Sequence, residues 1–302
     1  MQRPGVLILA SDARDYIPLL ADLAGGGIEL TAAANAAEAR ARYSGQPVVL
    51  GQPDLVAASL EWMPQVRWVQ STWAGVTPVL AQARRDFVLT GVKNAFGLQM
   101  AEYVLAYLLA HELKMFERLG RQANRIWWDE PSGSLKGKTL GVMGTGSIGS
   151  HIARILKPFG MRTVGLNRSG TRAGVFDEVY PVSQMEEFLA GPDYLVCVLP
   201  DTPATTGLLD AKAFGAMKNS CYLLNVGRGK LIDEEALADA LYAGELAGAV
   251  LDVFGDEPLP TDSRLWSTPG LIVTGHVAAS SWPEDIARIF SENYRRYCEN
   301  EP

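Results

Sequence analysis

The sequence is poor in cysteine and in long uncharged runs, and each shortage excludes a class of protein. Its three cysteines, Cys197, Cys221 and Cys298, stand far apart, so they form neither a disulfide framework nor a zinc-binding pattern. This usage is typical of a reducing compartment, and we expect a cytoplasmic protein without a catalytic metal. The longest uncharged stretch, 265–283, is broken by Pro269, by glycines and by hydroxyl residues, so we expect no membrane span.

Positive charge is also in short supply. The chain has 27 Lys and Arg against 34 Asp and Glu, a formal net charge of −7. A negative protein does not attract phosphate backbones or anionic lipids over a broad face, so we expect neither nucleic acid nor a membrane as partner. With 48% hydrophobic and 20% charged residues, the composition is that of an ordinary globular protein. A length of 302 residues is enough for two domains.

Short β-branched runs alternate with helical stretches through most of the chain, which predicts an α/β fold with two doubly wound parallel sheets. We expect one domain formed by residues 1–98 and 276–302, and a second domain formed by residues 99–275. The predicted strands of the first sheet are 5–9, 27–31, 48–51, 66–70 and 87–89. Those of the second sheet are 139–143, 163–166, 194–199, 222–225, 249–253 and 271–274.

Two long helices complete this prediction. Residues 99–118 carry apolar side chains on nearly every side, which indicates a buried helix between domains or subunits. Residues 283–298 form an amphipathic pattern with no strand of their own, and we expect this helix to pack back on the first domain.

A glycine-rich turn, GTGSIG, directly follows one predicted strand and directly precedes a predicted helix. This order is typical of a dinucleotide-binding site. Gly144 would turn the chain tightly, Gly146 would let a pyrophosphate approach the backbone, and Gly149 would let helix and strand pack closely. Ser147 and Ile148 would then offer amide hydrogens at the positive end of the helix.

The residues after the next strand bear on the choice of cofactor. NAD enzymes usually place there an acid that binds the ribose 2′-hydroxyl, whereas this chain has Asn167. Arg168, Ser169 and Arg172 follow, with two guanidinium groups and a hydroxyl where a 2′-phosphate would lie. We therefore predict a preference for NADP(H), with NAD(H) as the alternative. Otherwise, both arginines are simply solvated surface residues.

Histidine is scarce as well: the chain has three, His111, His151 and His276. His111 lies in the predicted long helix and His151 in the helix after the glycine turn, where packing or capping is expected. His276 instead follows a predicted strand, at the carboxyl edge where open α/β sheets bind ligands. Because histidine is the usual proton carrier near neutral pH, His276 is the candidate for proton transfer.

Three charged residues lie at or after neighbouring strand ends. Arg228 stands in a glycine-flanked turn, and an arginine there suits a carboxylate; Asp252 and Glu257 stand in the segment LDVFGDEPLP. With His276, these side chains should converge on one cleft. The bland alternatives are an ion-pair role for Arg228, a solvated loop position for Glu257 and a satisfied loop histidine at His276.

The sequence resembles the D-isomer-specific 2-hydroxyacid dehydrogenase family through several ordered motifs. These are GTGSIG at 144–149, NVGRG at 225–229, LDVFGDEP at 251–258 and HVAA at 276–279. Together with NRS at 167–169, they are similar to the glyoxylate/hydroxypyruvate reductase branch. The resemblance covers nearly the whole chain. It implies a Rossmann cofactor domain inserted in a flavodoxin-like substrate domain.

The resemblance also implies roles. Arg228 would bind the substrate carboxylate and keto oxygen, Glu257 would pair with the histidine, and His276 would be the general acid. Asp252 would hold the nicotinamide amide. Further cofactor contacts are expected at strand ends, namely at Leu199, Pro200, Val226, Gly227 and Arg228. Gly275 stands where the family usually has proline, so we expect a more mobile loop before His276.

In the first domain, the loop Trp73, Ala74, Gly75 and Val76 resembles the family's loop whose backbone amides grip the substrate carboxylate. Trp73 replaces a small residue, and it either narrows the pocket or merely packs. Trp282 either lines the substrate pocket or packs against its helix.

The implied activity is NAD(P)-dependent reduction of a small 2-oxo acid to the D-2-hydroxy acid, in a homodimer. Two alternatives stay open. One is a dinucleotide-sensing, corepressor-like binding protein. The other is a dehydrogenase of a different 2-hydroxy acid with NAD, or an enzyme that takes hydride from formate or phosphite.

Overall fold

The structure is a computed structural model that describes residues 4–171 and 174–299. The chain divides into two compact units at 95/96 and 280/281. Unit 1 contains both ends of the chain, and unit 2 is Phe96–Ser280. The predicted boundaries, 98/99 and 275/276, were therefore misplaced by a few residues.

Each misplacement has a local cause. Helix α6 of unit 2 begins at Gly97, before the predicted boundary. The residues after the second predicted boundary remain bonded to unit 2, because the amides of His276, Val277 and Ala278 all donate hydrogen bonds to Asp252.

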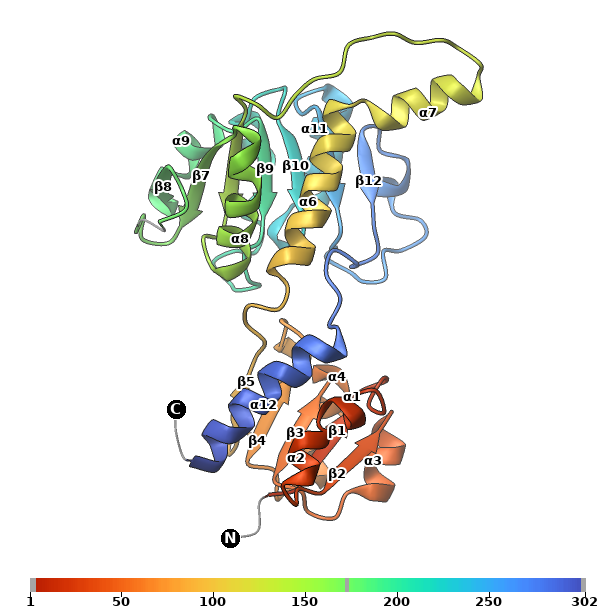
Figure 1. The fold of residues 1–302 in the computed structure, drawn as a ribbon. Coiled ribbons are helices and arrows are strands. Elements are labelled where there is room, and N and C mark those ends of the chain that lie inside the picture. Colours follow the sequence, from red (N-terminus) through yellow and green to blue (C-terminus); the bar gives the residue numbers. More distant parts are fainter. Residues whose placement is uncertain (1–3, 172–173, 300–302) are drawn as a thin grey trace. The chain divides into compact units, whose positions relative to one another are not determined.

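Unit 1 contains a parallel sheet of five strands in the order β2-β1-β3-β4-β5 (Figure 1), which is the order of flavodoxin-like folds. Its strands are β1 (Val6–Leu9), β2 (Leu30–Ala33), β3 (Val48–Gly51), β4 (Trp68–Ser71) and β5 (Val88–Thr90). Its helices are α1 (Tyr16–Leu19), α2 (Ala21–Gly25), α3 (Ala36–Arg42), α4 (Pro53–Ala57), α5 (Thr77–Leu80) and α12 (Pro283–Glu299).

The C-terminal helix α12 packs on unit 1, although it comes last in the chain. Trp68 of β4 is 2% exposed and stacks on Phe290 at 5.4 Å between ring centroids and on Tyr297 at 5.0 Å. Tyr294 donates a hydrogen bond to the carbonyl of Pro4 at 2.6 Å. Aromatic pairs of this kind stabilise a fold by more than the burial of their apolar area alone. Through these contacts, α12 covers one face of the sheet.

Unit 2 contains a parallel sheet of seven strands in the order β12-β11-β10-β9-β6-β7-β8 (Figure 1). Its strands are β6 (Thr139–Met143), β7 (Arg162–Asn167), β8 (Glu178–Pro181), β9 (Tyr194–Cys197), β10 (Tyr222–Asn225), β11 (Gly248–Leu251) and β12 (Leu271–Val273). Its helices are α6 (Gly97–Glu112), α7 (Met115–Ala123), α8 (Ser147–Leu156), α9 (Met185–Leu189), α10 (Ala211–Gly215) and α11 (Glu234–Ala243). The prediction of two doubly wound parallel-sheet domains is confirmed.

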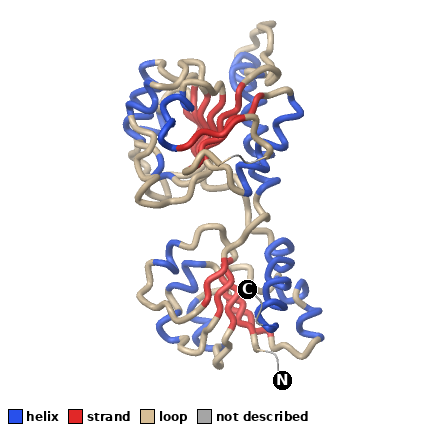
Figure 2. Tube along the Cα trace, turned by 90° about the vertical axis from the view of Figure 1, so that its left-hand side faces the viewer, coloured by secondary structure: helices blue, strands red, loops and turns tan. Residues whose placement is uncertain are grey.

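Helices cover both faces of the unit 2 sheet, as the tube view shows (Figure 2). Side chains alternate along each strand, so Tyr194 and Val196 of β9 join the core under α6 and α8. Leu195 and Cys197 of the same strand join the core on the opposite face. Because both faces are buried, the strands appear in the sequence as short continuous apolar runs.

The start of several helices is fixed by a side chain that accepts a hydrogen bond from a free backbone amide in the first turn, three residues further along the chain. Asn35 accepts from the amide of Glu38 at 2.9 Å, Asp210 from Ala213 at 2.9 Å and Asp233 from Ala236 at 3.0 Å. Each such cap contributes about 1 kcal/mol of helix stability. Of the helices within residues 4–171 and 174–299, not one has both the length and the apolarity that a membrane crossing requires.

The single helix predicted over 99–118 is wrong, because the chain breaks at Lys114, which has a φ of +51°. The carbonyls that would continue the helix have other partners. Gly133 donates its amide to the carbonyl of Glu112 at 2.8 Å, and Arg118 donates Nε to that of Leu113 at 2.8 Å. The chain therefore ends α6 at Glu112 and begins α7 at Met115.

Candidate active site

The glycine turn between β6 and α8 has the geometry that a pyrophosphate requires. Gly144 has a φ of +108°, a backbone conformation that residues other than glycine rarely adopt. A Cβ on Gly149 would overlap the carbonyl oxygen of Gly144, whereas a Cβ on Gly146 would meet no described atom within 4 Å. Ser147 and Ile148 open α8, so their amides have no partner inside the helix. The turn thus has room and donors for an anionic ligand.

Asn167 builds the next turn instead of offering a free side chain to a ligand. Its Nδ2 donates to Thr145 Oγ1 and to the carbonyl of Thr171, both at 2.9 Å. Its Oδ1 accepts from the amides of Ser169 at 3.1 Å and Gly170 at 2.7 Å. The result is a tight loop on which Arg168 and Ser169 are exposed. The predicted Arg172 lies outside the described residues.

Arg228 follows β10 at the same carboxyl edge. Its half-buried guanidinium donates one hydrogen bond, to the carbonyl of Gly227 at 2.6 Å. Asn225 fixes the turn by donating to the carbonyl of Arg228 at 3.0 Å and accepting from the amide of Gly227 at 3.2 Å. A Cβ on Gly229 would overlap the backbone of Phe254, so this turn packs directly on the loop after β11.

Two other predicted cofactor contacts, Leu199 and Pro200, lie in the loop after β9, next to that turn. The backbones of Cys197 and Leu199 approach Gly227 so closely that a Cβ there would lie 3.1 Å from both of their carbonyl oxygens. Val226 is 3% exposed, and Pro200 is exposed at the surface. The loops after β9 and β10 therefore form one packed surface.

Glu257 and His276 form the predicted pair. His276 Nδ1 lies 2.7 Å from Glu257 Oε2, and Glu257 Oε1 accepts from the amide of Phe254 at 3.0 Å. The side chain of His276 is 54% exposed and that of Glu257 is 36% exposed. The imidazole is therefore held by a carboxylate yet remains accessible. Because Nδ1 is engaged, Nε2 is the nitrogen that can carry a proton to or from a ligand.

Asp252 anchors the loop that carries the histidine. Its carboxylate is 1% exposed and accepts from the Thr274 hydroxyl at 2.7 Å and from the amides of Val277 and Ala278, both at 2.9 Å. Its carbonyl accepts from the amide of His276 at 2.8 Å. A carboxylate has about four acceptor positions, and three of those of Asp252 are occupied by these bonds. Contact of the remaining position with a nicotinamide amide stays a prediction.

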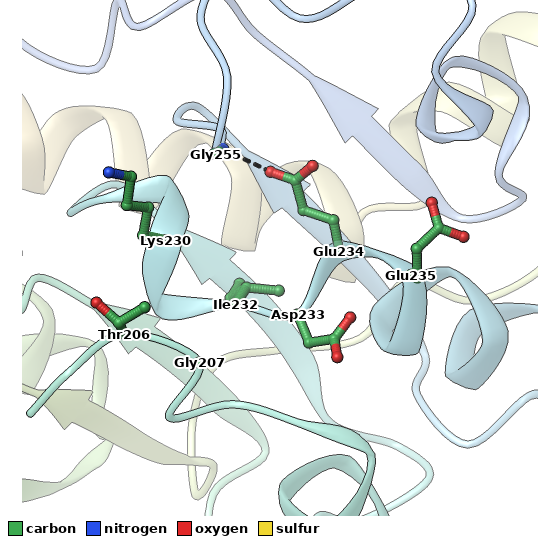
Figure 3. A pocket seen from close by; sticks show the side chains of 8 residues that line it. All are labelled: Thr206, Gly207, Lys230, Ile232, Asp233, Glu234, Glu235 and Gly255. Atoms are coloured by element: carbon green, nitrogen blue, oxygen red, sulfur yellow. Dashed lines mark hydrogen bonds between the residues drawn. The ribbon is translucent and has the colours of Figure 1, made fainter. Parts of the chain in front are cut away.

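Glu234, which no sequence pattern indicated, also supports the loop that carries Glu257. Its Oε1 accepts from the amide of Gly255 at 2.7 Å (Figure 3). Burial, together with the nearby Asp256 and Glu235, raises the pKa of Glu234. The contact lies beside a hollow of about 430 Å³ whose lining also includes Lys230 and Thr206 but not the predicted catalytic side chains. An acid in the first turn of a helix usually indicates only dipole stabilisation, so its contact with the loop had no clear sequence signal.

In unit 1, the loop after β4 is shaped by Ser71. Its Oγ accepts from the amide of Trp73 at 3.0 Å and donates to the carbonyl of Trp73 at 2.7 Å. Trp73 and Trp282 are 37% and 50% exposed, so neither residue packs in the core. The substrate-binding role of the loop that includes Ala74, Gly75 and Val76 stays a prediction.

The other two histidines are packed within unit 2. His111 lies 4.3 Å from the ring of Tyr222 and 6.0 Å from that of Tyr194, and burial lowers its pKa. The ring of His151 fills the space beside Gly97, where a Cβ would overlap it. Of the three histidines, His276 is the one paired with an accessible carboxylate.

Residues 105–278 match the family described as D-isomer specific 2-hydroxyacid dehydrogenase, NAD binding domain. A protein named glyoxylate/hydroxypyruvate reductase A from Photorhabdus laumondii is 36% identical over 200 residues, which are 66% of this chain and 64% of that protein. One of the same name from Escherichia fergusonii is 30% identical over 269 residues, which are 83% of this chain and 86% of that protein.

Solved structures are similar over the whole chain. A D-isomer specific 2-hydroxyacid dehydrogenase family protein from Aeromonas salmonicida has a TM-score of 0.95 at 40% identity, covering 100% of this chain and 97% of that one. An NADPH-dependent glyoxylate/hydroxypyruvate reductase from Sinorhizobium meliloti, in complex with NADP and sulfate, has a TM-score of 0.86 at 29% identity, covering 99% and 96%. The resemblance predicted from the motifs is confirmed: this chain belongs to the D-isomer specific 2-hydroxyacid dehydrogenase family.

Proposed function

We propose that the protein reduces a small 2-oxo acid of the glyoxylate or hydroxypyruvate type to the D-2-hydroxy acid, with NADPH as the preferred reductant. The observation that carries this proposal is the 2.7 Å contact between His276 Nδ1 and Glu257 Oε2 at the carboxyl edge of the unit 2 sheet. An imidazole that is tied to a carboxylate through one nitrogen and accessible at the other is suited to deliver a proton.

The residues divide the chemistry between them. NADPH, when bound, supplies the hydride that the keto carbon receives. His276 Nε2 gives its proton to the keto oxygen, so that a C–H bond and an O–H bond replace the C=O π bond. Glu257 binds Nδ1 of the imidazole, which leaves Nε2 to carry the proton. Arg228 binds the substrate carboxylate and stabilises the negative charge that develops on the keto oxygen.

The cofactor preference rests on unit 2 alone. The open space over Gly146 and the first amides of α8 fit a pyrophosphate. The loop organised by Asn167 exposes Arg168 and Ser169, so that a guanidinium and a hydroxyl are available to a 2′-phosphate. The Sinorhizobium meliloti relative, whose structure contains NADP, supports the same choice.

Replacing Arg168 with alanine should reduce the preference for NADPH. Hydrogen bonds to charged groups contribute about 1.5–3 kcal/mol, so we expect the KM for NADPH to rise by about tenfold or more while that for NADH changes little. Steady-state kinetics with both cofactors measure this. Arg162→Ala is the matched control, since Arg162 is an exposed arginine at the opposite end of β7. Equal losses with NADH and NADPH would contradict the assignment.

Replacing Glu257 with glutamine should lower kcat for reduction by about tenfold. Glutamine retains the shape of the side chain but removes the negative charge that binds His276 Nδ1, and hydrogen bonds to charged groups contribute about 1.5–3 kcal/mol. The measurement is kcat with saturating NADPH. Asp256→Asn, which neutralises the exposed neighbouring acid, is the control. A kcat equal to that of the wild type would argue against the pair.

The proposal as a whole is tested by following the nicotinamide absorbance with NADPH and NADH against glyoxylate, hydroxypyruvate, pyruvate and bulkier 2-oxo acids. We expect the highest kcat/KM with NADPH as the cofactor and with either glyoxylate or hydroxypyruvate as the acid. Tight cofactor binding without turnover of any acid would instead favour a dinucleotide-sensing protein. Efficient turnover of only a bulky acid with NADH would favour a different dehydrogenase.

A further inference from the structure

The segment that carries His276 is attached to helix α6 at two points. Gln99 donates Nε2 to the carbonyl of Ser280 at 3.0 Å and accepts from the amide of Ser280 through Oε1 at 2.8 Å. The Tyr103 hydroxyl lies 2.6 Å from Thr274 Oγ1. These two attachments flank His276 in the chain, one before it and one after it.

Gln99 and Tyr103 are four residues apart, so they share one face of α6. The helix itself is fixed in the core of unit 2, because Ala101, Val104 and Leu108 are fully buried among sheet residues. In Figure 1, α6 (gold) lies beside β12 (blue). A rigid helix thus provides two fixed points for an otherwise irregular segment.

The proton count sets the direction of the hydrogen bonds. The Thr274 hydroxyl has a single proton, and it donates this proton to Asp252 Oδ1. Tyr103 must therefore donate its own proton to Thr274 Oγ1. Burial raises the pKa of the Tyr103 hydroxyl, which keeps this donor protonated. The chain of donors runs from Tyr103 through Thr274 to the carboxylate that also binds the amides after His276.

The backbone of His276 has an uncommon conformation. Its φ is +57°, in the left-handed region that residues other than glycine adopt uncommonly, although asparagine, aspartate and histidine adopt it more often than most. A residue keeps such a conformation only where surrounding contacts determine it. The preceding Gly275 adds no stiffness of its own.

We propose that Gln99 and Tyr103 are positioning residues for His276, which hold its loop from α6 through Ser280 and through Thr274 with Asp252. They touch no reacting atom in this account. The proposal rests on the proposed function for its kinetic consequences, but its structural part concerns the orientation of His276 alone.

The kinetic test compares Tyr103→Phe, Thr274→Val and the double variant. We expect kcat for 2-oxo acid reduction to fall about three- to tenfold in each single variant, with an unchanged KM for NADPH. The double variant should be no slower than Thr274→Val, because both substitutions interrupt the same series of hydrogen bonds from Tyr103 through Thr274 to Asp252. Thr274→Ser keeps the hydroxyl and should stay near the wild-type kcat, and Gln99→Leu should resemble Tyr103→Phe.

The matched control is Tyr222→Phe. Tyr222 is a buried tyrosine at the amino end of β10, at the opposite edge of the sheet, so loss of its hydroxyl should leave kcat within about twofold. If removal of any buried tyrosine hydroxyl lowered kcat, Tyr222→Phe would be slow as well. If Tyr103 acts by positioning His276, kcat should fall in Tyr103→Phe and not in Tyr222→Phe.

A second readout does not depend on turnover. The chain has three histidines, so the ring signals of His276 in NMR spectra can be assigned with His276→Asn. In the complex with NADP⁺, Tyr103→Phe and Gln99→Leu should shift or broaden the His276 signals and leave those of His151 in place. Unchanged His276 signals and kcat in both variants would overturn the inference, even if thermal stability fell. So would multiplied losses in the double variant. A wild-type protein without turnover would refute the proposed function, while the NMR result would still decide the inference.

Discussion

Replacing His276 with alanine should lower kcat for 2-oxo acid reduction by about 10²–10⁴-fold. This is the usual contribution of a positioned general acid, and in this chain no other histidine pairs with an accessible carboxylate within the described residues. Single-turnover mixing with saturating NADPH measures the chemical step directly. The expected loss lies in kcat, because the variant retains the groups that bind the cofactor.

Two controls separate chemistry from folding. The affinity of His276→Ala for NADPH, measured by nicotinamide fluorescence, should remain within about twofold of the wild-type value. Added imidazole should restore part of the lost rate by supplying the missing proton donor. A variant that keeps more than about a tenth of the wild-type kcat would contradict the role of His276 as general acid.

Replacing Arg228 with alanine should lower kcat/KM for the 2-oxo acid by about 10²–10³-fold. The substitution removes both the partner of the substrate carboxylate and a donor to the developing oxyanion, and one such donor contributes about 2.7–4 kcal/mol. The KM for the acid should rise strongly, and that for NADPH should change less. Steady-state kinetics at several concentrations of each substrate distinguish the two effects.

Lysine and a neighbouring cation provide the comparisons for Arg228. Arg228→Lys should recover part of the activity, because an ammonium keeps the charge but not the bidentate geometry. Lys230→Ala should leave kcat/KM nearly unchanged, since Lys230 is an exposed side chain that lines the hollow beside α11. Equal losses in the variants at 228 and 230 would indicate a general charge effect and refute the specific role.

The sequence predicted those parts of the fold that local physics determines. Buried parallel strands appear as short apolar runs, and the glycine turn stands between a strand and a helix, so both were recognisable. The strand predicted at 27–31 lies instead at Leu30–Ala33, because Gly27 has a φ of +81° and still belongs to a turn. The strand Glu178–Pro181 was missed, since it is a short edge strand that ends in proline.

The candidate site was predicted less completely, because its supports come from distant parts of the chain. Glu257 and His276 could be proposed from their places after strands, and the structure joins them. Asn167 uses its side-chain amide to fold a loop, a role that its position in the sequence did not indicate, and its contact with the cofactor stays a prediction. Gln99 and Tyr103 are polar residues in an apolar helical pattern, which does not predict their partners. The homodimer stays a prediction.

We propose that the Arg228 guanidinium and the His276 imidazole act on one keto oxygen. A crystal structure with NADP⁺ and oxamate, an unreactive 2-oxo acid analogue, tests it most directly. We expect His276 Nε2 and an Arg228 N–H within about 2.7–3.2 Å of the amide oxygen that replaces the keto oxygen, with Glu257 still on Nδ1. Oxamate bound away from these side chains, or His276 turned away from the nicotinamide, would contradict the account.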